Sequence, residues 1–460
     1  MKDTTHISIN FVHQAAILHR RKIIMNDARL VFAVYLAAMC LMEVTPTVRN
    51  YGRRKYASEK TIISRNDTRR STSLGEFSND SKTLNFIQLV SKHGYPAEEH
   101  LVTTADGYRL KIHRIPGSPT RPRAPGKPIV YFQHGLLASS DSWVLVGPKK
   151  DLAFMMADAG FDVWLGNARG NTYSRSHVTL RPDFDPEFWH YSFHEIGIYD
   201  MPAIIDYVLD RTGEQNLIYI GHSMGTTISY VLLSTRPEYN DKVWLLISLA
   251  PVAFWQAPPR PIIKFLKSNT EAIKTVLYAA RIYEIFPRTK ATVRILKSLC
   301  SNKSPIRPLC IDMLWFVSGY NPSQLDKNLV PWVFSYFPAG TSRHTLEHYS
   351  QNIATGDFRM FDYGLTRNFA IYGQADAPAY NLENIKTPVA LYYGGGDALV
   401  SPGNPIELAK RLPNVVLLER VADDRFSHLD FILSNDVKPL LNEPIMAATM
   451  NFLKRRSSTW

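Results

Sequence analysis

Short apolar runs alternate with helical patterns from about residue 83 onward, and this alternation sets the expected fold. The runs are rich in β-branched and aromatic residues and end at glycine or a polar turn, which is typical of buried strands. Helix-compatible stretches such as 226–233 and 406–412 lie between them, so a mostly parallel sheet flanked by helices is expected. The predicted strands are 128–133, 160–165, 216–220, 243–249, 389–393 and 415–421.

The alternation lapses between about Phe254 and Glu383, where the chain becomes rich in proline, lysine and aromatic residues. It resumes at Val389, so residues 254–383 are interpreted as one insertion into a single core, not as a separate domain. The core is then expected to comprise residues 83–253 and 384–460. Ligands are expected beyond the carboxyl ends of its strands.

The first 45 residues are interpreted as an N-terminal extension with a signal-peptide-like segment. Its apolar run, residues 30–42, follows a basic flank and is shorter than the roughly 20 residues that span a bilayer as a helix. We therefore expect no transmembrane span in the mature protein. Met25 is an alternative start that would give a conventional signal, and a signal anchor or a mispredicted first exon is the competing interpretation.

Residues 46–82 are polar and poor in large apolar side chains, so a flexible or propeptide-like linker is expected there. The basic triplet 53–55 is either a processing site or a solvated basic run. Glycosylation sequons begin at Asn66, Asn79 and Asn302, which favours export. In an exported chain, Cys300 and Cys310 are expected to form a disulfide; two reduced thiols are the alternative.

The composition excludes several classes of protein. With 45% hydrophobic and 20% charged residues, the chain is neither wholly disordered nor collagen-like. Its net charge is +12, and residues 1–82 hold 14 Lys and Arg against 7 Asp and Glu. More than half of the excess positive charge therefore lies in the tail, and no nucleic-acid partner is expected.

The strongest chemical signal is Gly221-His-Ser223-Met-Gly225, a G-x-S-x-G motif between a predicted strand and a helix-compatible run. A serine on such a sharp turn has strained backbone angles that expose its hydroxyl, and the glycines leave room for close approach. Because that hydroxyl is a weak nucleophile, it needs a base in hydrogen-bond reach and an acid that orients the base. An incidental serine in a tight turn is the alternative interpretation.

The acid and the base should follow later strands. Asp397 closes a glycine-rich turn after strand 389–393, and His428 lies beyond the last strand and before the final helix. Asp430 is only two residues from the histidine and is not expected to orient it. The chain order Ser223, Asp397, His428 is that of α/β-hydrolases.

Acyl transfer also needs backbone N–H groups that bind the oxyanion of the tetrahedral intermediate. One should follow the nucleophile and one should lie in the loop after an early strand. We expect the N–H groups of Met224 and Leu136 to form this pair, with Leu137 as the alternative to Leu136.

Two further patterns leave alternatives open. His190 and His194 stand four residues apart, a spacing that can bind a metal from one helix face, but no third ligand is adjacent, and neither a metal nor another cofactor is expected. The aromatic residues of the insertion could line an acyl pocket or pack among themselves. They include Trp255, Trp315, Phe316, Trp332, Phe334, Tyr336 and Phe337.

Over about residues 84–455 the sequence resembles the acid lipase family, which contains gastric and lysosomal acid lipases and their insect relatives. The resemblance implies an α/β-hydrolase with a helical cap, no cofactor, the triad Ser223, Asp397 and His428, and a Cys300–Cys310 bridge. One departure is Met224, where many members have glutamine; a backbone amide there is unaffected. The matching segments are 94–100, 103–108, 134–138, 162–172, 199–203, 221–225, 361–364 and 428–432.

The expected function is a secreted or lysosomal serine lipase that hydrolyses neutral lipid esters, triacylglycerol or sterol ester, at a lipid–water interface. Two alternatives share the scaffold. One is a non-catalytic lipid carrier, because fold alone does not determine function. The other is a short-chain carboxylesterase or thioesterase that uses the same triad. The sequence leaves the oligomeric state open.

Overall fold

The computed structural model describes residues 83–457, and its centre is an eight-stranded sheet of order β1-β2-β4-β3-β5-β6-β9-β10. From β4 to β10 all neighbours are parallel, whereas β2 pairs antiparallel with both β1 and β4. The mostly parallel α/β fold predicted from the sequence is therefore confirmed. The strands are β1 (Glu98–Thr103), β2 (Arg109–Ile115), β3 (Ile129–Gln133), β4 (Asp162–Leu165), β5 (Leu217–His222), β6 (Val243–Leu249), β9 (Val389–Tyr393) and β10 (Val415–Arg420).

Strands β1 and β2 were not among the predicted strands. β1 lies at the edge of the sheet and alternates between exposed residues and residues that are buried or partly buried, so it has no continuous apolar run. Its Glu98 instead accepts hydrogen bonds from Arg114 and Arg123. Antiparallel edge strands of this kind are identified by their pairing partner more than by their own composition.

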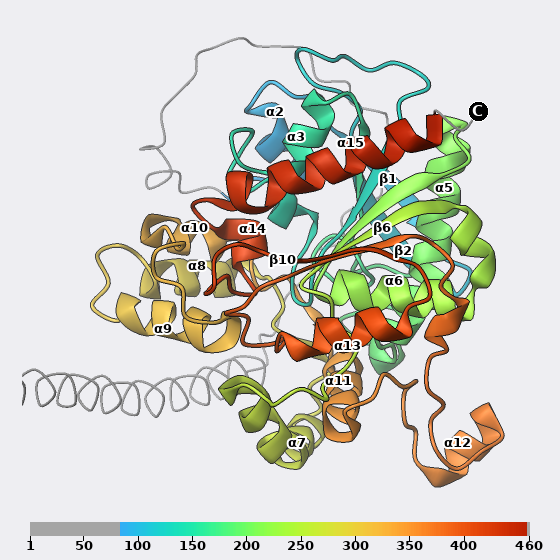
Figure 1. Cartoon of the computed structure of the whole chain (residues 1–460). Coiled ribbons are helices and arrows are strands. Elements are labelled where there is room, and N and C mark those ends of the chain that lie inside the picture. Colours follow the sequence, from blue (N-terminus) through green and yellow to red (C-terminus); the bar gives the residue numbers. More distant parts are fainter. Residues whose placement is uncertain (1–82, 458–460) are drawn as a thin grey trace, which may run out of the picture.

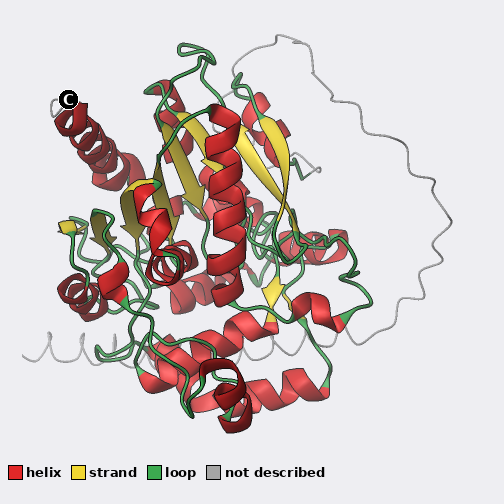
Figure 2. Cartoon of the chain, turned by 90° about the vertical axis from the view of Figure 1, so that its right-hand side faces the viewer, coloured by secondary structure: helices red, strands yellow, loops and turns green. Residues whose placement is uncertain are grey.

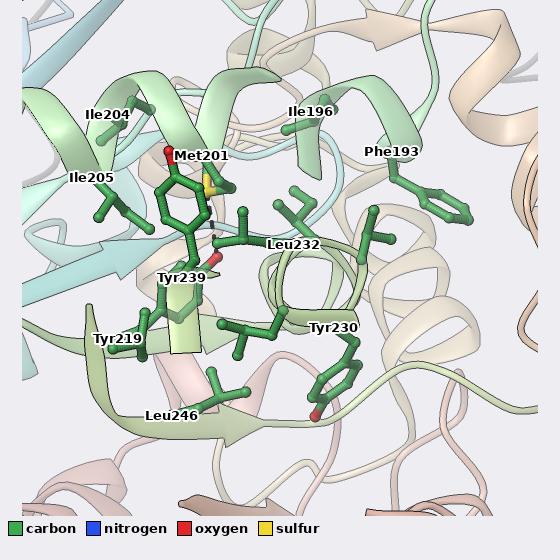
Figure 3. Packing of buried hydrophobic residues seen from close by; sticks show 14 of the residues in the cluster. Phe193, Ile196, Met201, Ile204, Ile205, Tyr219, Tyr230, Leu232, Tyr239 and Leu246 are labelled. Carbon is green, nitrogen blue, oxygen red and sulfur yellow. Dashed lines mark hydrogen bonds between the residues drawn. The ribbon is translucent and has the colours of Figure 1, made fainter. Parts of the chain in front are cut away.

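The sheet separates two hydrophobic clusters, because successive side chains of a strand point to opposite faces. In β3, Tyr131 joins one cluster and Phe132 joins the other. The first cluster packs the sheet against α5 (Met201–Thr212) and α6 (Met224–Thr235), as Figure 3 shows for Met201 and Leu232. The second packs it against helices on the other face. The result is a three-layer arrangement of helices, sheet and helices.

Helices outside the insertion cover both faces of the sheet (Figure 1 and Figure 2). The long C-terminal helix runs across the face that carries the second cluster, to which its Ile445 belongs. These helices are α2 (Phe86–Ser91), α3 (Leu152–Asp158), α4 (Phe193–Glu195), α13 (Gly403–Arg411), α14 (Asp430–Leu433) and α15 (Glu443–Ser457).

The chain between β6 and β9 forms a mainly helical unit, called the insert below, that gathers below and to the left of the sheet in Figure 1. A short hairpin of β7 (Glu284–Ile285) and β8 (Thr341–Ser342) lies within it. Boundaries at 254 and 383 stay predictions. The insert helices are α7 (Pro261–Ala279), α8 (Lys290–Leu299), α9 (Arg307–Ser318), α10 (Val330–Val333), α11 (Arg343–Thr355) and α12 (Leu365–Tyr372).

Aromatic residues of the insert pack into hydrophobic clusters. Trp332 and Tyr336 join the second cluster of the sheet, so this part of the insert is continuous with the core. Phe334 and Trp315 contribute to a smaller cluster around α9, and Trp255 and Phe316 to another. Core packing thus explains most of these side chains.

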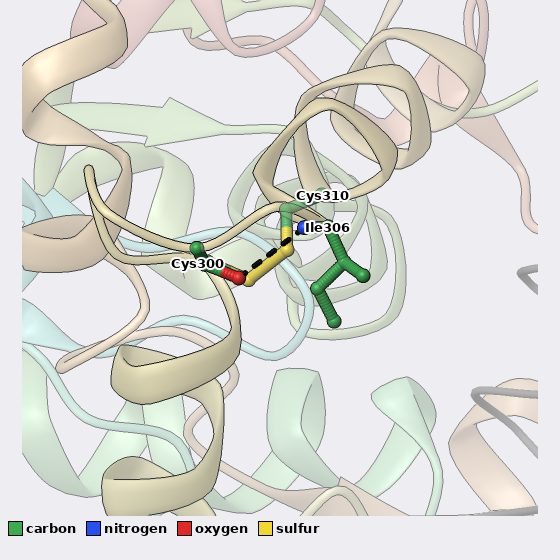
Figure 4. The surroundings of a disulfide bond; sticks show 4 residues. Cys300, Ile306 and Cys310 are labelled. Carbon is green, nitrogen blue, oxygen red and sulfur yellow. Dashed lines mark hydrogen bonds between the residues drawn. A yellow bond between two sulfur atoms is a disulfide. The ribbon is translucent and has the colours of Figure 1, made fainter.

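A disulfide joins Cys300 and Cys310 and closes the turn between α8 and α9 (Figure 4), in agreement with the predicted pairing. Asn302 is exposed in that turn. Asn66, Asn79, the apolar run 30–42 and the basic triplet 53–55 lie outside the described residues. Within residues 83–457 no helix is long and apolar enough to cross a membrane.

A buried histidine joins the insert to the core. His348 of α11 is fully buried, stacks on Phe193 with ring centroids 3.7 Å apart, and directs its Nε2 to the carbonyl oxygen of Arg359 at 2.8 Å. Its Nδ1 lies 3.0 Å from the Ser192 hydroxyl. Burial lowers the pKa of His348 from 6.5 to about 3. The side chain is therefore neutral in the folded protein at moderately acidic pH.

The burial of His348 predicts that the protein becomes less stable as the pH decreases. Because the pKa of His348 is lower in the folded than in the unfolded chain, its contribution is present above about 6.5 and is lost as the pH falls toward about 3. One such group changes the free energy of unfolding by up to about 1.4 kcal/mol per pH unit. The free energy of unfolding, measured with urea at pH 7, 6, 5 and 4, should change less steeply with pH in His348→Gln than in the wild type. Glutamine keeps an N–H donor for the Arg359 carbonyl oxygen but does not titrate. Equal slopes for both proteins would contradict this account.

Candidate active site

Ser223 occupies the sharp turn between β5 and α6. Its φ of 53° and ψ of −117° lie in a region that non-glycine residues rarely adopt, so the turn is strained. The backbone holds this conformation by donating the Ser223 N–H to Leu249 O at 3.0 Å and by accepting Thr226 N–H at 2.9 Å. Strand β5 therefore ends directly before Ser223 and α6 begins directly after it, so the serine lies at the corner between them.

The two glycines of the motif allow the corner to form. A Cβ on Gly221 would lie 2.7 Å from the Gly225 carbonyl oxygen, and one on Gly225 would lie 2.3 Å from the Gln133 carbonyl oxygen. Both distances are too short for real carbon atoms. The first turn of α6 thus packs against β5 and against the end of β3 only because these positions lack side chains.

His428 connects Ser223 to Asp397. Its Nε2 lies 2.8 Å from the serine Oγ and its Nδ1 lies 2.7 Å from Asp397 Oδ2. The other carboxylate oxygen accepts the N–H groups of Leu399 and Val400, each at 2.8 Å. Since the carboxylate can only accept, Nδ1 carries the proton and Nε2 is free to accept one from the serine. This arrangement can remove the serine proton and stabilise the imidazolium that results.

The loop after β3 lies against the serine. A Cβ on Gly135 would be 3.2 Å from Ser223 Cβ. His134 fixes this loop: its Nδ1 bonds the Gly135 carbonyl oxygen at 2.8 Å and its Nε2 accepts Ala168 N–H at 3.1 Å. Burial lowers the pKa of His134 to about 4, which keeps both contacts in one tautomer.

The expected oxyanion donors directly follow Gly135 and Ser223 in the sequence. Leu136 belongs to the loop after β3, and Met224 opens α6 directly after the serine. Among residues 83–457, neither backbone N–H donates to a protein acceptor. Leu137, the alternative donor, has a φ of 60°, and its carbonyl oxygen accepts Ala339 N–H from the insert at 2.7 Å.

His222 contacts the catalytic-site candidate His428, and the sequence did not predict this contact. Its Nε2 donates to the backbone carbonyl oxygen of His428 at 3.1 Å. Burial, reinforced by the neighbouring His428, lowers the pKa of His222 to about 3. A neutral His222 adds no charge beside His428 when that ring becomes protonated. The only available signal was its place inside the G-x-S-x-G motif.

Asp430 does not orient the histidine ring. Its Oδ2 accepts the backbone N–H of Ser427 at 2.7 Å and an N–H of the Asn321 side chain at 2.9 Å. It therefore shapes the loop that carries His428 and links that loop to the insert. Ring orientation comes from Asp397 instead.

His190 and His194 contact different partners and do not form a pair of metal ligands. The His190 ring packs against that of His344, and His194 Nδ1 lies 2.8 Å from the Tyr380 hydroxyl. In the part of the chain that the structure describes, no group of three or more His, Cys, Asp or Glu side chains could hold a metal ion.

The site is covered in this conformation. The exposed fraction is 9% for Ser223, 4% for His428 and 1% for Asp397. Gly319 of the insert lies against Gly396 and Ser427, the residues that directly precede Asp397 and His428. Low solvent access strengthens the electrostatic interactions among Ser223, His428 and Asp397.

Comparisons with known proteins agree with this architecture. The profile described as a partial alpha/beta-hydrolase lipase region matches residues 86–147, and the one described as alpha/beta hydrolase fold matches residues 128–434. A crystal structure of a candidate lipase from Sulfolobus solfataricus is similar with a TM-score of 0.50 at 14% identity, over 75% of this chain and 90% of that one. This last likeness supports the fold alone.

Similarity to curated lipases is closer. Lipase 3 of Drosophila melanogaster is 38% identical over 79% of this chain and 92% of its own length. Human lipase member K is 36% identical over 83% and 94%, and human gastric triacylglycerol lipase 35% over 77% and 88%. The chain therefore belongs to the acid lipase family of α/β-hydrolases, the family of the gastric lipases, and is a lipid ester hydrolase.

Proposed function

We propose that this protein is a serine lipase that hydrolyses neutral lipid esters through an acyl-enzyme on Ser223. The observation that carries the proposal is the continuous chain of hydrogen bonds from Ser223 Oγ through His428 to Asp397, at 2.8 and 2.7 Å. It occurs on a strained strand-to-helix turn, as nucleophilic serines of this fold require.

In the proposed reaction His428 Nε2 takes the proton of Ser223 as Oγ attacks the ester carbonyl carbon. Asp397 stabilises the imidazolium, and the N–H groups of Leu136 and Met224 donate to the oxyanion. His428 then gives its proton to the leaving alcohol, which departs and leaves an acyl-serine. A water molecule, deprotonated by the same histidine, releases the fatty acid and restores the serine.

The proposed substrates are triacylglycerols or sterol esters at a lipid–water interface. Support for an acylglycerol comes from the printed name of the gastric triacylglycerol lipases, which this chain resembles over most of its length. The insert is proposed to act as a cap over the site, and the low exposure of Ser223 implies that part of the cap moves to admit a lipid ester.

A secreted or lysosomal location is proposed as well. A disulfide in the insert is typical of proteins that fold in an oxidising compartment. The exposed sequon at Asn302, beside that disulfide, is accessible to the glycosylation machinery of the same compartment.

Replacing the nucleophile should abolish turnover. Ser223→Ala removes the attacking oxygen, and the expected loss of kcat is at least about 10³-fold. The matched control is Ser234→Ala on the same helix, whose hydroxyl donates to the Val231 carbonyl oxygen. Both variants and the wild type are assayed on a soluble short-chain ester. Full activity in Ser223→Ala would overturn the assignment.

Substrate length separates the lipase from its alternatives. We expect the wild type to hydrolyse emulsified long-chain triacylglycerol or sterol ester, measured as fatty acid release at pH 5 and 7, with the activity lost in Ser223→Ala. Turnover of a soluble short-chain ester or thioester alone would identify a short-chain esterase or thioesterase. Lipid binding without any turnover would identify a carrier.

Export predicts glycosylation at the insert. Protein made in a secreting eukaryotic cell should migrate faster on a denaturing gel after removal of N-linked glycans. Asn302→Gln should lose one increment of that shift, because its side chain is exposed. An identical shift in wild type and variant would show that this sequon is unused.

A further inference from the structure

The loops that carry Asp397 and His428 meet one turn of the insert. The carbonyl oxygen of Ser318, the last residue of α9, accepts Ala398 N–H at 3.1 Å and His428 N–H at 2.9 Å. Ser318 is 3% exposed. A single carbonyl with two lone pairs thus ties the backbone next to the acid to the backbone of the base.

Gly319 allows this contact. Its φ of 116° and ψ of 149° belong to a region that only glycine adopts readily. A Cβ there would lie 2.2 Å from the Gly396 carbonyl oxygen and 3.1 Å from Ser427 Cβ. These two neighbours directly precede Asp397 and His428, so the turn packs against both loops at once.

The following residues contact the His428 loop and the segment after α14. Asn321 donates to Asp430 Oδ2 at 2.9 Å and to Asp423 Oδ2 at 2.8 Å. Gln324 accepts Asp436 N–H at 3.0 Å. A cavity of only about 10 Å³ remains where these residues meet the loop, so the contact is close. Residues 318–324 are called the brace below.

The His428 backbone is therefore held from two sides. The brace accepts its N–H, and His222 of the nucleophile turn donates to its carbonyl oxygen. The ring must keep Nε2 near Ser223 Oγ and Nδ1 near Asp397 Oδ2 at the same time. A displacement of about 1 Å at a reacting group can cost about 10²-fold in rate.

We propose that the brace, through Ser318 and Gly319, consists of positioning residues that set the separation of the Asp397 and His428 loops and so keep the base aligned with the nucleophile. This inference rests on the proposed function. It divides the insert: the end of α9 is part of the catalytic framework and stays docked, and any motion that admits substrate occurs in other parts of the insert.

The test is Gly319→Ala, assayed on a soluble short-chain ester so that lipid adsorption plays no part. The added methyl group pushes the brace away from Gly396, so kcat should fall at least about 10-fold while KM stays within about two-fold. The control is Gly364→Ala in the insert, with a φ of 83° and ψ of 161° but nothing within 4 Å of a Cβ. It shares the backbone strain without the displacement and should keep wild-type kcat.

A wild-type kcat in a folded Gly319→Ala would overturn the proposal, and so would an equal loss in both glycine variants. If Gly319→Ala does not fold, Asn321→Ala decides. It removes the donor to Asp430 and should lower kcat with KM unchanged. Its control is Gln351→Ala, whose side-chain amide bonds the backbone of Asp362 in the insert, and equal kcat values for these two variants would overturn the proposal.

The proposed function is tested separately in the same assay. An active Ser223→Ala would show that the triad itself is misassigned. An inactive Ser223→Ala beside a fully active Gly319→Ala would instead overturn only the positioning role of the brace.

Discussion

The backbone of Ser223 is the constraint on which the rest of the site depends. Its positive φ costs about 1–3 kcal/mol, so it persists only because the surroundings fix both flanks. Strand β5 is hydrogen-bonded between β3 and β6, and α6 is seated on the end of β3 where Gly225 has no side chain. With the corner fixed, the serine Cβ is fixed as well, and the hydroxyl lies 2.8 Å from His428 Nε2, which is bonded in turn to Asp397.

The parallel sheet explains why residues far apart in the sequence reach that hydroxyl. Parallel strands place their carboxyl ends along one edge, and the loops after β3, β5, β9 and β10 all emerge there. These loops carry Leu136, Ser223, Asp397 and His428. The sheet thus positions the candidate site residues on loops, and the sequence of such loops can vary without changing the sheet.

The insert has two relations to this edge. It contributes Ser318, whose carbonyl oxygen accepts hydrogen bonds from the loops that carry Asp397 and His428, and it is proposed to act as a cap over Ser223, which is 9% exposed. The disulfide anchors α9, the helix that ends at Ser318, to the turn after α8. Aromatic residues of α10 and the turn after it continue the core packing. The proposed cover and the observed support therefore come from the same inserted segment.

Much of this arrangement could be read from the sequence, because its signals are local. Six of the sheet strands are apolar runs, the corner is marked by Gly221, Ser223 and Gly225, and chain order singled out Asp397 and His428. The antiparallel strands β1 and β2, the contact of His222 with His428, and the two hydrogen bonds accepted by Ser318 were decided by tertiary structure alone. Backbone carbonyls have no residue-specific signature, and an edge strand is defined by its partner, so such contacts exist only after distant segments have packed together.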